Sequence, residues 1–339
     1  MMKNKIIEKS REEELNAKNS QYVDEEEVKN IISSAKNVAI FGHVNPDLDC
    51  YGSMFGAKYL CEKLGANAHL FANNPETSFL NQIFDKSVVE KDFEPSKFDL
   101  VLMVDCNEFS RIDIKFREKV QAHKNILAID HHEHSIIESG CKFYIKSDVC
   151  AASMIVANLI FTYKFKLNYE TASYIFAGIV GDTERFLNTN TDLDTFKCIV
   201  KLMEYGIDIQ KIYDVVYRSI TREKIELQKY LLDNYHVEGK NICYIVVTTK
   251  VMKKLKATVD DVKFYVNSLN NIKDFNVIMV AYEIDKNKYK VSCRSKNGFI
   301  VSKVAQHHGG GGHQMAAGFN LYGNKNAIKH KLKKICEEF

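Results

Sequence analysis

The chain has 339 residues, which is enough for two domains of ordinary size. Its 45% hydrophobic and 27% charged residues are typical of a soluble globular protein. The net charge is only +3, from 47 basic and 44 acidic residues, so the sequence predicts no overall basic field for binding long duplex nucleic acid.

Nine cysteines occur without CxxC pairs or regular spacing, which is typical of free thiols in a reducing cytosol rather than of a disulfide framework. The N-terminal segment carries mixed charges and no apolar core, so it is not expected to be a signal peptide. The longest mostly apolar run, residues 149–161, is too short to span a bilayer. The sequence therefore predicts a cytoplasmic protein without a membrane partner.

Residues 1–35 are expected to form a solvated helical extension, with a contact in a homodimer as an open alternative. Beyond them, short β-rich runs alternate with helices. The expected strands are 37–41, 68–72, 99–104 and 126–129, and the expected helices are 51–64, 151–163 and 171–180. This alternation indicates a first domain over residues 36–205, built on a parallel sheet covered on both faces.

Near residue 195 the pattern changes to long helical stretches, which favours a helical linker over residues 206–234. Strands are expected again at 241–248, 275–283 and 289–294, with a helix at 260–269 and a lysine-rich helix at the end. The predicted fold is therefore a two-domain α/β chain. Its second domain, residues 235–339, is expected to be smaller and to contain a mixed sheet.

Acids and imidazoles follow the predicted strands, or lie in adjoining loops, in four segments of the first domain. In open α/β sheets, ligands bind at the carboxyl ends of the strands. Carboxylates mixed with imidazoles suit Mn²⁺, Fe²⁺, Zn²⁺ or Co²⁺, and the absence of cysteine from the set argues against a closed structural zinc site. The candidates are His43, Asp47, Asp49, Asp105, Asp130, His131, His132 and Asp182.

The spacing of these acids suits two metal ions. Asp47 and Asp49, two residues apart, could face different ions, and Asp105 on a neighbouring strand could bridge them. Two ions about 3.5–4 Å apart can clamp a phosphoryl group. Taken singly, Asp47 is better explained as a helix N-cap or surface residue, and Asp130 is better explained as a partner that orients an imidazole than as a ligand. His134 is expected to lie at the surface or to contact a metal ligand without binding the metal itself.

Five motifs in order along the chain carry a family resemblance. Nearly the whole chain after the N-terminal extension resembles the DHH phosphoesterases with their DHH-associated C-terminal domain. Within that family it is similar to the bacterial nanoRNase and pAp phosphatase group. The motifs are His43-Val-Asn-Pro-Asp47-Leu-Asp49, Asp105-Cys-Asn107, Asp130-His131-His132, Gly181-Asp182-Thr183, and the Gly309–Gly312 run followed by His313.

The resemblance implies two divalent ions, with Mn²⁺ favoured and Mg²⁺, Co²⁺ or Fe²⁺ as alternatives. It implies catalytic roles for His132, beside the scissile phosphate, and for Asp130, which would orient an imidazole. Three residues, Leu48, Cys50 and Glu184, depart from the Gly, Ala and Gly usual in the family. None of these departures removes a ligand, but with Leu48 and Glu184 the shape of the substrate entrance does not follow from the resemblance. The implied ligands are His43, Asp47 and Asp105 for one ion, and Asp49, Asp105, His131 and Asp182 for the other.

Substrate-binding residues are expected mainly in the second domain. Consecutive glycines let a backbone approach a ligand closely, and their amides can form an anion-binding nest near a helix or turn start. Arg294, which matches a phosphate-binding arginine of the family, could present its guanidinium fork to a terminal phosphate. The adjacent His307 and His308 are weaker signals. The candidates are Arg294, Gly310, Gly311, Gly312, His313 and, from the first domain, Arg185.

The resemblance implies hydrolysis of short single-stranded RNA, including dinucleotides, to nucleoside 5′-monophosphates, and dephosphorylation of 3′-phosphoadenosine 5′-phosphate (pAp) to AMP. The active site is expected in the cleft between the two domains. Hydrolysis of cyclic di-AMP, or of its linear product pApA, is the nearest alternative. A catalytically inactive nucleotide sensor is the alternative from a different class.

Overall fold

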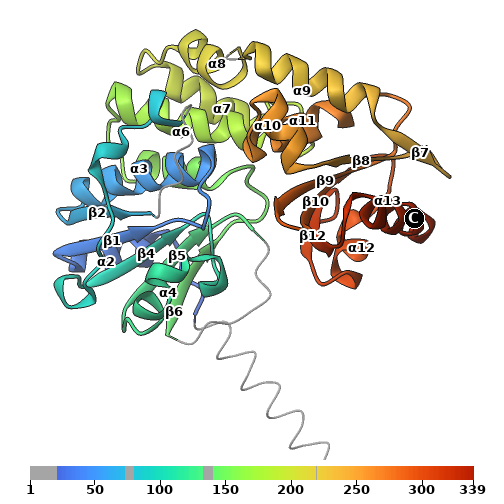
Figure 1. Cartoon of the computed structure of the whole chain (residues 1–339). Helices are drawn as coiled ribbons and strands as arrows, with labels where there is room; N and C mark the ends of the chain where they lie inside the picture. Colours follow the sequence, from blue (N-terminus) through green and yellow to red (C-terminus); the bar gives the residue numbers. More distant parts are fainter. Residues whose placement is uncertain (1–20, 73–79, 133–139, 219) are drawn as a thin grey trace, which may run out of the picture. The chain divides into compact units, whose positions relative to one another are not determined.

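The computed structural model describes residues 21–72, 80–132, 140–218 and 220–339. The expected surface residue His134 and residues 1–20 of the predicted extension lie outside these ranges. The chain divides into two compact units, Met1–Arg218 and Ser219–Phe339, which are described separately (Figure 1). The predicted linker is divided between them, because α8 (Ile209–Tyr217) belongs to the first unit and α9 (Arg222–Asp233) to the second.

The first unit contains an all-parallel six-stranded sheet, which confirms the sequence-based expectation. The chain runs outward from the central strand β1 in one direction, returns to β4 beside it, and then runs outward in the other direction. The point where this direction reverses, between β1 and β4, is where open sheets bind ligands. In spatial order the strands are β3 (Val89–Glu90), β2 (Asn67–Phe71), β1 (Asn37–Phe41), β4 (Leu100–Val104), β5 (Ile126–Asp130) and β6 (Cys141–Ile145).

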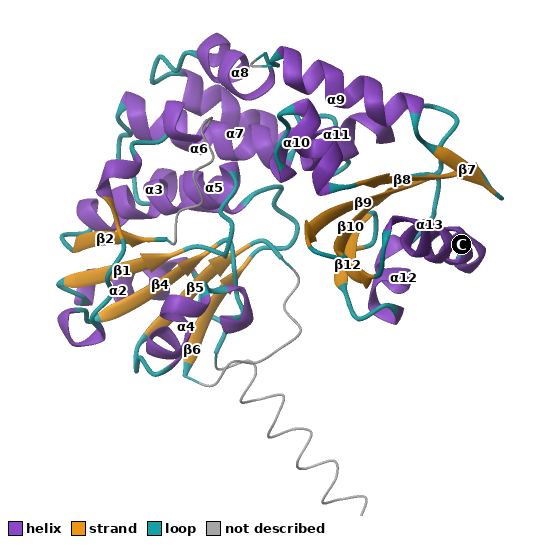
Figure 2. Cartoon of the chain, in the orientation of Figure 1, coloured by secondary structure: helices purple, strands orange, loops and turns teal. Residues whose placement is uncertain are grey.

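Helices cover both faces of this sheet (Figure 2). One face packs against α3 (Leu48–Lys63), α5 (Ala152–Thr162) and α6 (Tyr169–Asp182), and the other packs against α4 (Ile114–Gln121). The three helices of the first face approach one another closely because small residues lie where they touch. A Cβ atom on Gly178 of α6 would lie 2.1 Å from Ser153 Oγ and 3.0 Å from Asp49 Oδ1. The close packing therefore lies directly against an acid of the candidate site.

The expectation of a solvated N-terminal extension is wrong for its described helix, α2 (Glu25–Ser34). Val28 and Ile32, one turn apart, are fully buried in the main core of the first unit. The remaining helix of this unit, α7 (Leu193–Met203), follows a capping box formed by Asp192 and Thr195. Among the described residues, no helix is both long and apolar enough to cross a membrane.

The second unit contains a mixed six-stranded sheet, as expected. Its neighbours run antiparallel except for β8 and β9, which run parallel. One face packs against α12 (Val301–His307) and α13 (Lys325–Ile335), and the other packs against α9, α10 (Thr249–Leu255) and α11 (Val259–Asn270). The strands in spatial order are β11 (Gly311–His313), β12 (Ala316–Tyr322), β10 (Lys288–Ser295), β9 (Val277–Asp285), β8 (Ile242–Val247) and β7 (His236–Glu238).

All nine cysteines are buried and free, which confirms the prediction of free thiols. They are distributed over both units rather than paired. The cores of both units therefore depend on apolar packing and not on cross-links.

Candidate metal centre

Three neighbouring strands present the candidate ligands at the same edge of the first sheet. His43 lies two residues after β1, Asp105 follows β4 directly, and His131 follows β5 directly. Because β1, β4 and β5 are adjacent and parallel, their carboxyl ends meet at the reversal point of the sheet. The clusters recognised in the sequence are thus brought together by the strand order.

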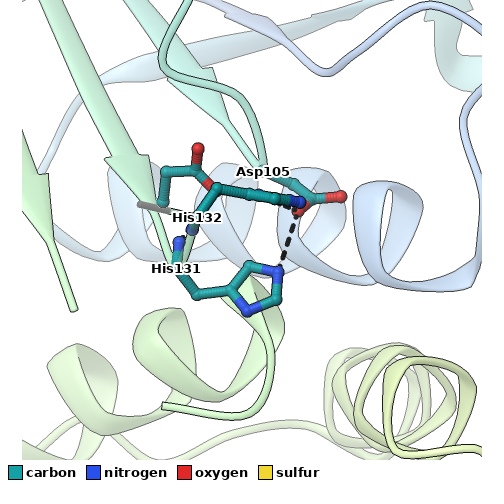
Figure 3. Close-up of side chains that lie close together, drawn as sticks. Asp105, His131 and His132 are labelled. Atoms are coloured by element: carbon teal, nitrogen blue, oxygen red, sulfur yellow. Dashed lines mark hydrogen bonds and ion pairs between the residues drawn. The ribbon is translucent and has the colours of Figure 1, made fainter. Parts of the chain in front are cut away.

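Asp105 lies between two imidazoles. Its Oδ2 atom is 3.3 Å from His43 Nε2, and its Oδ1 atom is 3.5 Å from His131 Nε2. The residue is buried, at 2% exposure, and adopts a left-handed backbone conformation with φ of 55°. Figure 3 shows Asp105 close to His131 and His132. Each carboxylate oxygen therefore faces a different histidine, which is the arrangement that a bridging ligand requires.

The remaining candidate ligands divide between these two histidines. Asp47 Oδ2 lies 3.8 Å from His43 Nε2. Asp49 Oδ2 and Asp182 Oδ2 each lie 3.9 Å from His131 Nε2. Atoms that share one ion at about 2.0–2.2 Å are themselves roughly 3–3.5 Å apart. The observed spacings are close to that range and longer than hydrogen bonds, so the residues fit two cation sites that share Asp105.

Both histidines are held in the orientation that metal binding needs. His43 Nδ1 lies 2.9 Å from Val44 O, and His131 Nδ1 lies 3.3 Å from Val149 O. A ring that donates its Nδ1 proton to a carbonyl keeps the lone pair on Nε2, and this is the usual arrangement behind metal-bound histidines. In both rings Nε2 is the atom that faces the carboxylates.

The two acids of the first motif are fixed by helix N-termini. Asp47 Oδ1 accepts hydrogen bonds from the amides of Asp49 and Cys50, both at 3.0 Å, while Oδ2 faces His43. The N-cap interpretation of Asp47 is therefore correct, and it is compatible with a ligand role for the other oxygen. Asp49 accepts hydrogen bonds from the amides of Ala152 at 2.7 Å and Ser153 at 2.8 Å, at the start of α5. This second anchor could not be predicted from the sequence, because it joins residues more than 100 positions apart.

Burial and mutual repulsion disfavour the ionised forms of the acids in this group. Burial, together with the negative charges of Asp105 and Asp182, raises the pKa of Asp49 to about 8. Burial also raises the pKa of Asp182 to about 7, against the lowering effect of His131. Burial would lower the pKa of His131, but its contact with Asp105 and the charges of Asp49 and Asp182 raise it to about 10. A divalent cation would supply the positive charge that these groups otherwise obtain from protons.

Asp105 provides a further test of the fit. Burial would raise its pKa, but the contacts with His131 and His43 outweigh burial and hold the pKa well below the ordinary value. Within the described residues its buried Oδ1 atom has no hydrogen-bond partner. A buried carboxylate oxygen normally has one, and a missing ion is one of the few explanations for an exception. The donor set and this unsatisfied oxygen both fit divalent metal binding.

The two proposed catalytic residues contact each other at the edge of this group. Asp130 Oδ1 lies 2.8 Å from His132 Nδ1 and accepts the amide of His131 at 2.7 Å. Asp130 is buried, at 1% exposure, and is positioned to orient His132. Asn107 donates from Nδ2 to His132 O at 3.3 Å, a role that the sequence analysis did not assign although Asn107 lies in a recognised motif.

The Cys50 thiol lies beside two of the candidate ligands. It offers Sγ within 4.8 Å of ligand atoms of His43 and Asp105. Burial raises the pKa of the Cys50 thiol well above its ordinary value, which keeps the sulfur protonated. A protonated thiol is a poor metal ligand, so Cys50 lies beside the predicted ligand set without joining it. Two imidazoles and four carboxylates still dominate the donor set.

Two departures from the family pattern are accommodated by the first unit. The side chain of Leu48 is buried against Gly181, where an added Cβ would lie 2.7 Å from Leu48 Cβ. Glu184 and Arg185 have positive φ values of 46° and 66°, in a left-handed turn that follows α6. Arg185 lies in the first unit with its guanidinium 4.7 Å from the centre of the Tyr217 ring.

The glycine run forms a strand edge rather than the start of a helix. Gly310 and Gly312 are glycines for packing reasons, because added Cβ atoms would lie 2.1 Å from Gly318 O and 2.5 Å from Ala316 O. A Cβ on Gly311 would meet nothing within 4 Å. Of the expected helix or turn start, the structure has the turn, at Gln314 and Met315 between β11 and β12. Gly311 is the position with open space.

Arg294 and His313 occupy one row of the second sheet. In the strand register, Arg294 of β10 pairs with Ala316 of β12, and Ala316 pairs with His313 of β11. Two strand spacings separate the Arg294 and His313 backbones by roughly 10 Å. Residues 19 positions apart in sequence are thus brought to neighbouring places, which the sequence did not reveal.

Comparisons with known proteins agree with this geometry. Residues 37–179 match the model of the DHH family, N-terminal domain, and residues 239–338 match the DHHA1 domain. The chain is 30% identical to the bifunctional oligoribonuclease and PAP phosphatase NrnA of Mycoplasma pneumoniae, over 88% of this chain and 91% of that protein. It is equally 30% identical to an uncharacterised protein of Mycoplasma genitalium, over 94% of this chain and 97% of that protein.

A solved structure shows the same fold. The crystal structure of an exopolyphosphatase-related protein from Bacteroides fragilis superposes with a TM-score of 0.86 and 24% sequence identity. The match covers 93% of this chain and 95% of that chain. At this identity the likeness concerns the fold alone.

We predict that Asp105→Asn weakens the binding of two divalent ions at once. Asparagine keeps the size of the side chain and tolerates a positive φ, so the change removes charge with little effect on the backbone. Even an outer partner of a metal ligand contributes about 10- to 100-fold to affinity, and we expect at least that loss. Equilibrium dialysis with Mn²⁺ measures it.

Asp92→Asn is the matched control, because the Asp92 side chain is 97% exposed and pairs with Lys115 rather than with a candidate ligand. It should bind Mn²⁺ like the unchanged protein. Loss of a single ion in Asp105→Asn, with the second bound normally, would contradict the shared position of Asp105.

Proposed function

Because the chain belongs to the DHH family and carries a DHHA1 domain, we propose that it is a metal-dependent phosphoesterase that hydrolyses short oligoribonucleotides to nucleoside 5′-monophosphates and converts pAp to AMP. The observation that carries this proposal is the position of Asp105 between His43 and His131. One carboxylate facing two imidazoles suits a two-ion site, and such sites act on phosphate esters. The name of the Mycoplasma pneumoniae relative supports the substrate class.

Under this proposal each ligand has one task. His43 and Asp47 would hold one ion, His131, Asp49 and Asp182 would hold the other, and Asp105 would hold both. The ions, when bound, would polarise the phosphoryl group and offset its charge. We propose Mn²⁺ as the native ion, because mixed imidazole and carboxylate sets suit it.

We propose that His132 acts on the phosphate ester itself. Its Nδ1 atom is engaged by Asp130 at 2.8 Å, which fixes the ring and favours Nε2 as the working atom. His132 would then stabilise charge on the phosphoryl group or donate a proton to the departing 3′-oxygen, with Asp130 as the positioning residue.

We propose that the second unit binds the terminal phosphate or nucleotide of the substrate. Partly exposed and buried residues alternate along β10, and Arg294 is one of the partly exposed residues. Lys290 lies on the same face, and an added Cβ on Gly318 would be 3.3 Å from Lys290 Cε. Two cations beside open glycine backbone at Gly311 form a surface suited to phosphate. Lys290 lies in no motif that would predict this role from the sequence.

The retained ligand set favours an enzyme over an inactive nucleotide sensor. A sensor needs no charge-balanced two-ion site, whereas all six candidate ligands are present here. The nine free thiols support the cytoplasm as the compartment that we propose.

The first test is a substrate panel assayed with and without metal. We predict that the chelated protein is inactive and that Mn²⁺ restores hydrolysis of pAp and of di- to pentaribonucleotides, because the carboxylate cluster needs cations to accept an anionic substrate. Cyclic di-AMP and pApA are the comparison substrates. If either of them is turned over faster, it replaces pAp and short RNA as the proposed substrate. If the protein is fully active after mass spectrometry has shown that it holds no metal, the metal site is refuted.

The second test separates binding from chemistry. Loss of a charge-assisted hydrogen bond to phosphate costs about 1.5–3 kcal/mol, or roughly 10- to 150-fold in affinity. We therefore predict that Arg294→Ala weakens pAp and diribonucleotide hydrolysis by about this factor while bis-p-nitrophenyl phosphate hydrolysis falls much less. Steady-state kinetics on both kinds of substrate measure the difference.

Arg222→Ala, an exposed arginine of α9 in the same unit, is the matched control and should leave both activities unchanged. His131→Ala should abolish both activities and lower the metal content. An equal loss on both substrates for Arg294→Ala, with normal metal content, would assign Arg294 to the chemical step instead.

A further inference from the structure

Two histidines that the proposed function leaves unused meet a C-terminal acid in the second unit. His307 is the last residue of α12, His308 caps that helix, and Glu338 lies in the final turn of the chain, Cys336–Glu338. His307 Nδ1 is 3.1 Å from Glu338 Oε2, and His308 Nε2 is 2.9 Å from Glu338 Oε1. Two imidazoles and both oxygens of one carboxylate therefore converge from segments 30 residues apart.

The surrounding structure holds this group in place. The His308 ring stacks on Phe319 of β12, with ring centres 5.1 Å apart and planes 27° from parallel. Phe319 is buried, as are Ile335 and Cys336, which anchor the C-terminal turn to the core. Figure 1 shows α12 beside α13 and the C-terminus. The group is thus built on packed elements rather than on a free tail.

Its geometry and access suit a cation. The three residues offer ligand atoms that all lie within 4.8 Å of one another. The side chains of His307, His308 and Glu338 are 74%, 24% and 28% exposed, so an ion could enter and keep water as further ligands. Two neutral imidazoles and one carboxylate are a donor set used by zinc sites with an open position.

We propose that His307, His308 and Glu338 form a third metal site, separate from the Asp105 centre, which binds Zn²⁺ or a similar borderline-soft divalent ion such as Ni²⁺ or Co²⁺. Imidazole nitrogen favours these ions, whereas Mg²⁺ and Mn²⁺ are better served by oxygen-rich sets. On binding, each imidazole would offer to the ion the ring nitrogen that faces Glu338.

The site would act on the glycine run that we assign to substrate binding. His308 directly precedes Gly309, and the Gly310 amide donates to Ala305 O of α12 at 2.8 Å. An ion held by His307, His308 and Glu338 would tie the end of α12 to the C-terminal turn and so stiffen the start of the glycine run. Ions that bind only the folded chain also raise its melting temperature.

The test measures zinc stoichiometry in the full-length, tag-free protein. Each variant is stripped with chelator, dialysed against buffered micromolar Zn²⁺, and analysed by mass spectrometry for zinc per chain. Zinc bound at the Asp105 centre should be equal in all variants, so it does not contribute to the difference in zinc content between them. We expect Glu338→Gln and His307→Ala to hold about one zinc ion less per chain than the unchanged protein, and to lose part of the Zn²⁺-dependent rise in melting temperature.

Matched controls come from the same segment. Glu337→Gln changes the adjacent exposed acid, and His330→Ala changes an exposed histidine of α13. Both should bind as much zinc as the unchanged protein. Because the His307 side chain is 74% exposed, its truncation should leave the fold intact, as circular dichroism would verify. Equal zinc stoichiometry and equal melting shifts in all five proteins would overturn the proposal.

Discussion

The carboxylate of Asp105, buried between two imidazoles, is the interaction on which the first unit depends. A buried anion costs several kcal/mol unless charges and hydrogen bonds compensate it. Here each oxygen faces a different histidine, and one oxygen has no hydrogen-bond partner among the described residues. The surrounding acids, Asp49 and Asp182, add to the negative charge rather than relieve it. The arrangement is electrostatically incomplete in the protein alone, and divalent cations would complete it.

The fold supplies this arrangement through strand order and close helix packing. Parallel strands with a reversal between β1 and β4 bring the first three motifs to one edge. The fourth motif arrives on α6, which can approach because Gly178 has no side chain to displace Ser153 and Asp49. Helix α5 then directs two backbone amides at Asp49. Stability and function are therefore coupled, since the contacts that pack α3, α5 and α6 also fix a ligand.

The elements and ligands that could be predicted from the sequence are those with strong local signals. Short apolar runs that end in acids, such as the one ending at Asp105, identify both the strand and the functional residue. Strands β3, β7, β11 and β12 were not predicted, because strands of two or three residues, or strands that contain glycine, have weak periodicity and depend on their neighbours. The five-residue strand β6 was not predicted either. The burial of α2 was missed because its apolar residues, Val28 and Ile32, are few among charged ones.

Contacts between segments far apart in the sequence could not be predicted from any local sequence pattern. The amides of α5 that bind Asp49, the approach of the Cys50 thiol, and the alignment of Arg294 with His313 each join residues through tertiary structure. The glycine run shows the same limit, because Gly310 and Gly312 are required by a neighbouring strand that the sequence did not predict.

The account rests on one claim, that Asp105 is shared by two ions. Anomalous X-ray scattering at the manganese edge, from crystals of the Mn²⁺-loaded protein, tests this most directly. The account predicts two peaks about 3.5–4 Å apart, one on the His43 side of Asp105 and one on the His131 side. A single peak, or two peaks of which one does not contact Asp105, would contradict it.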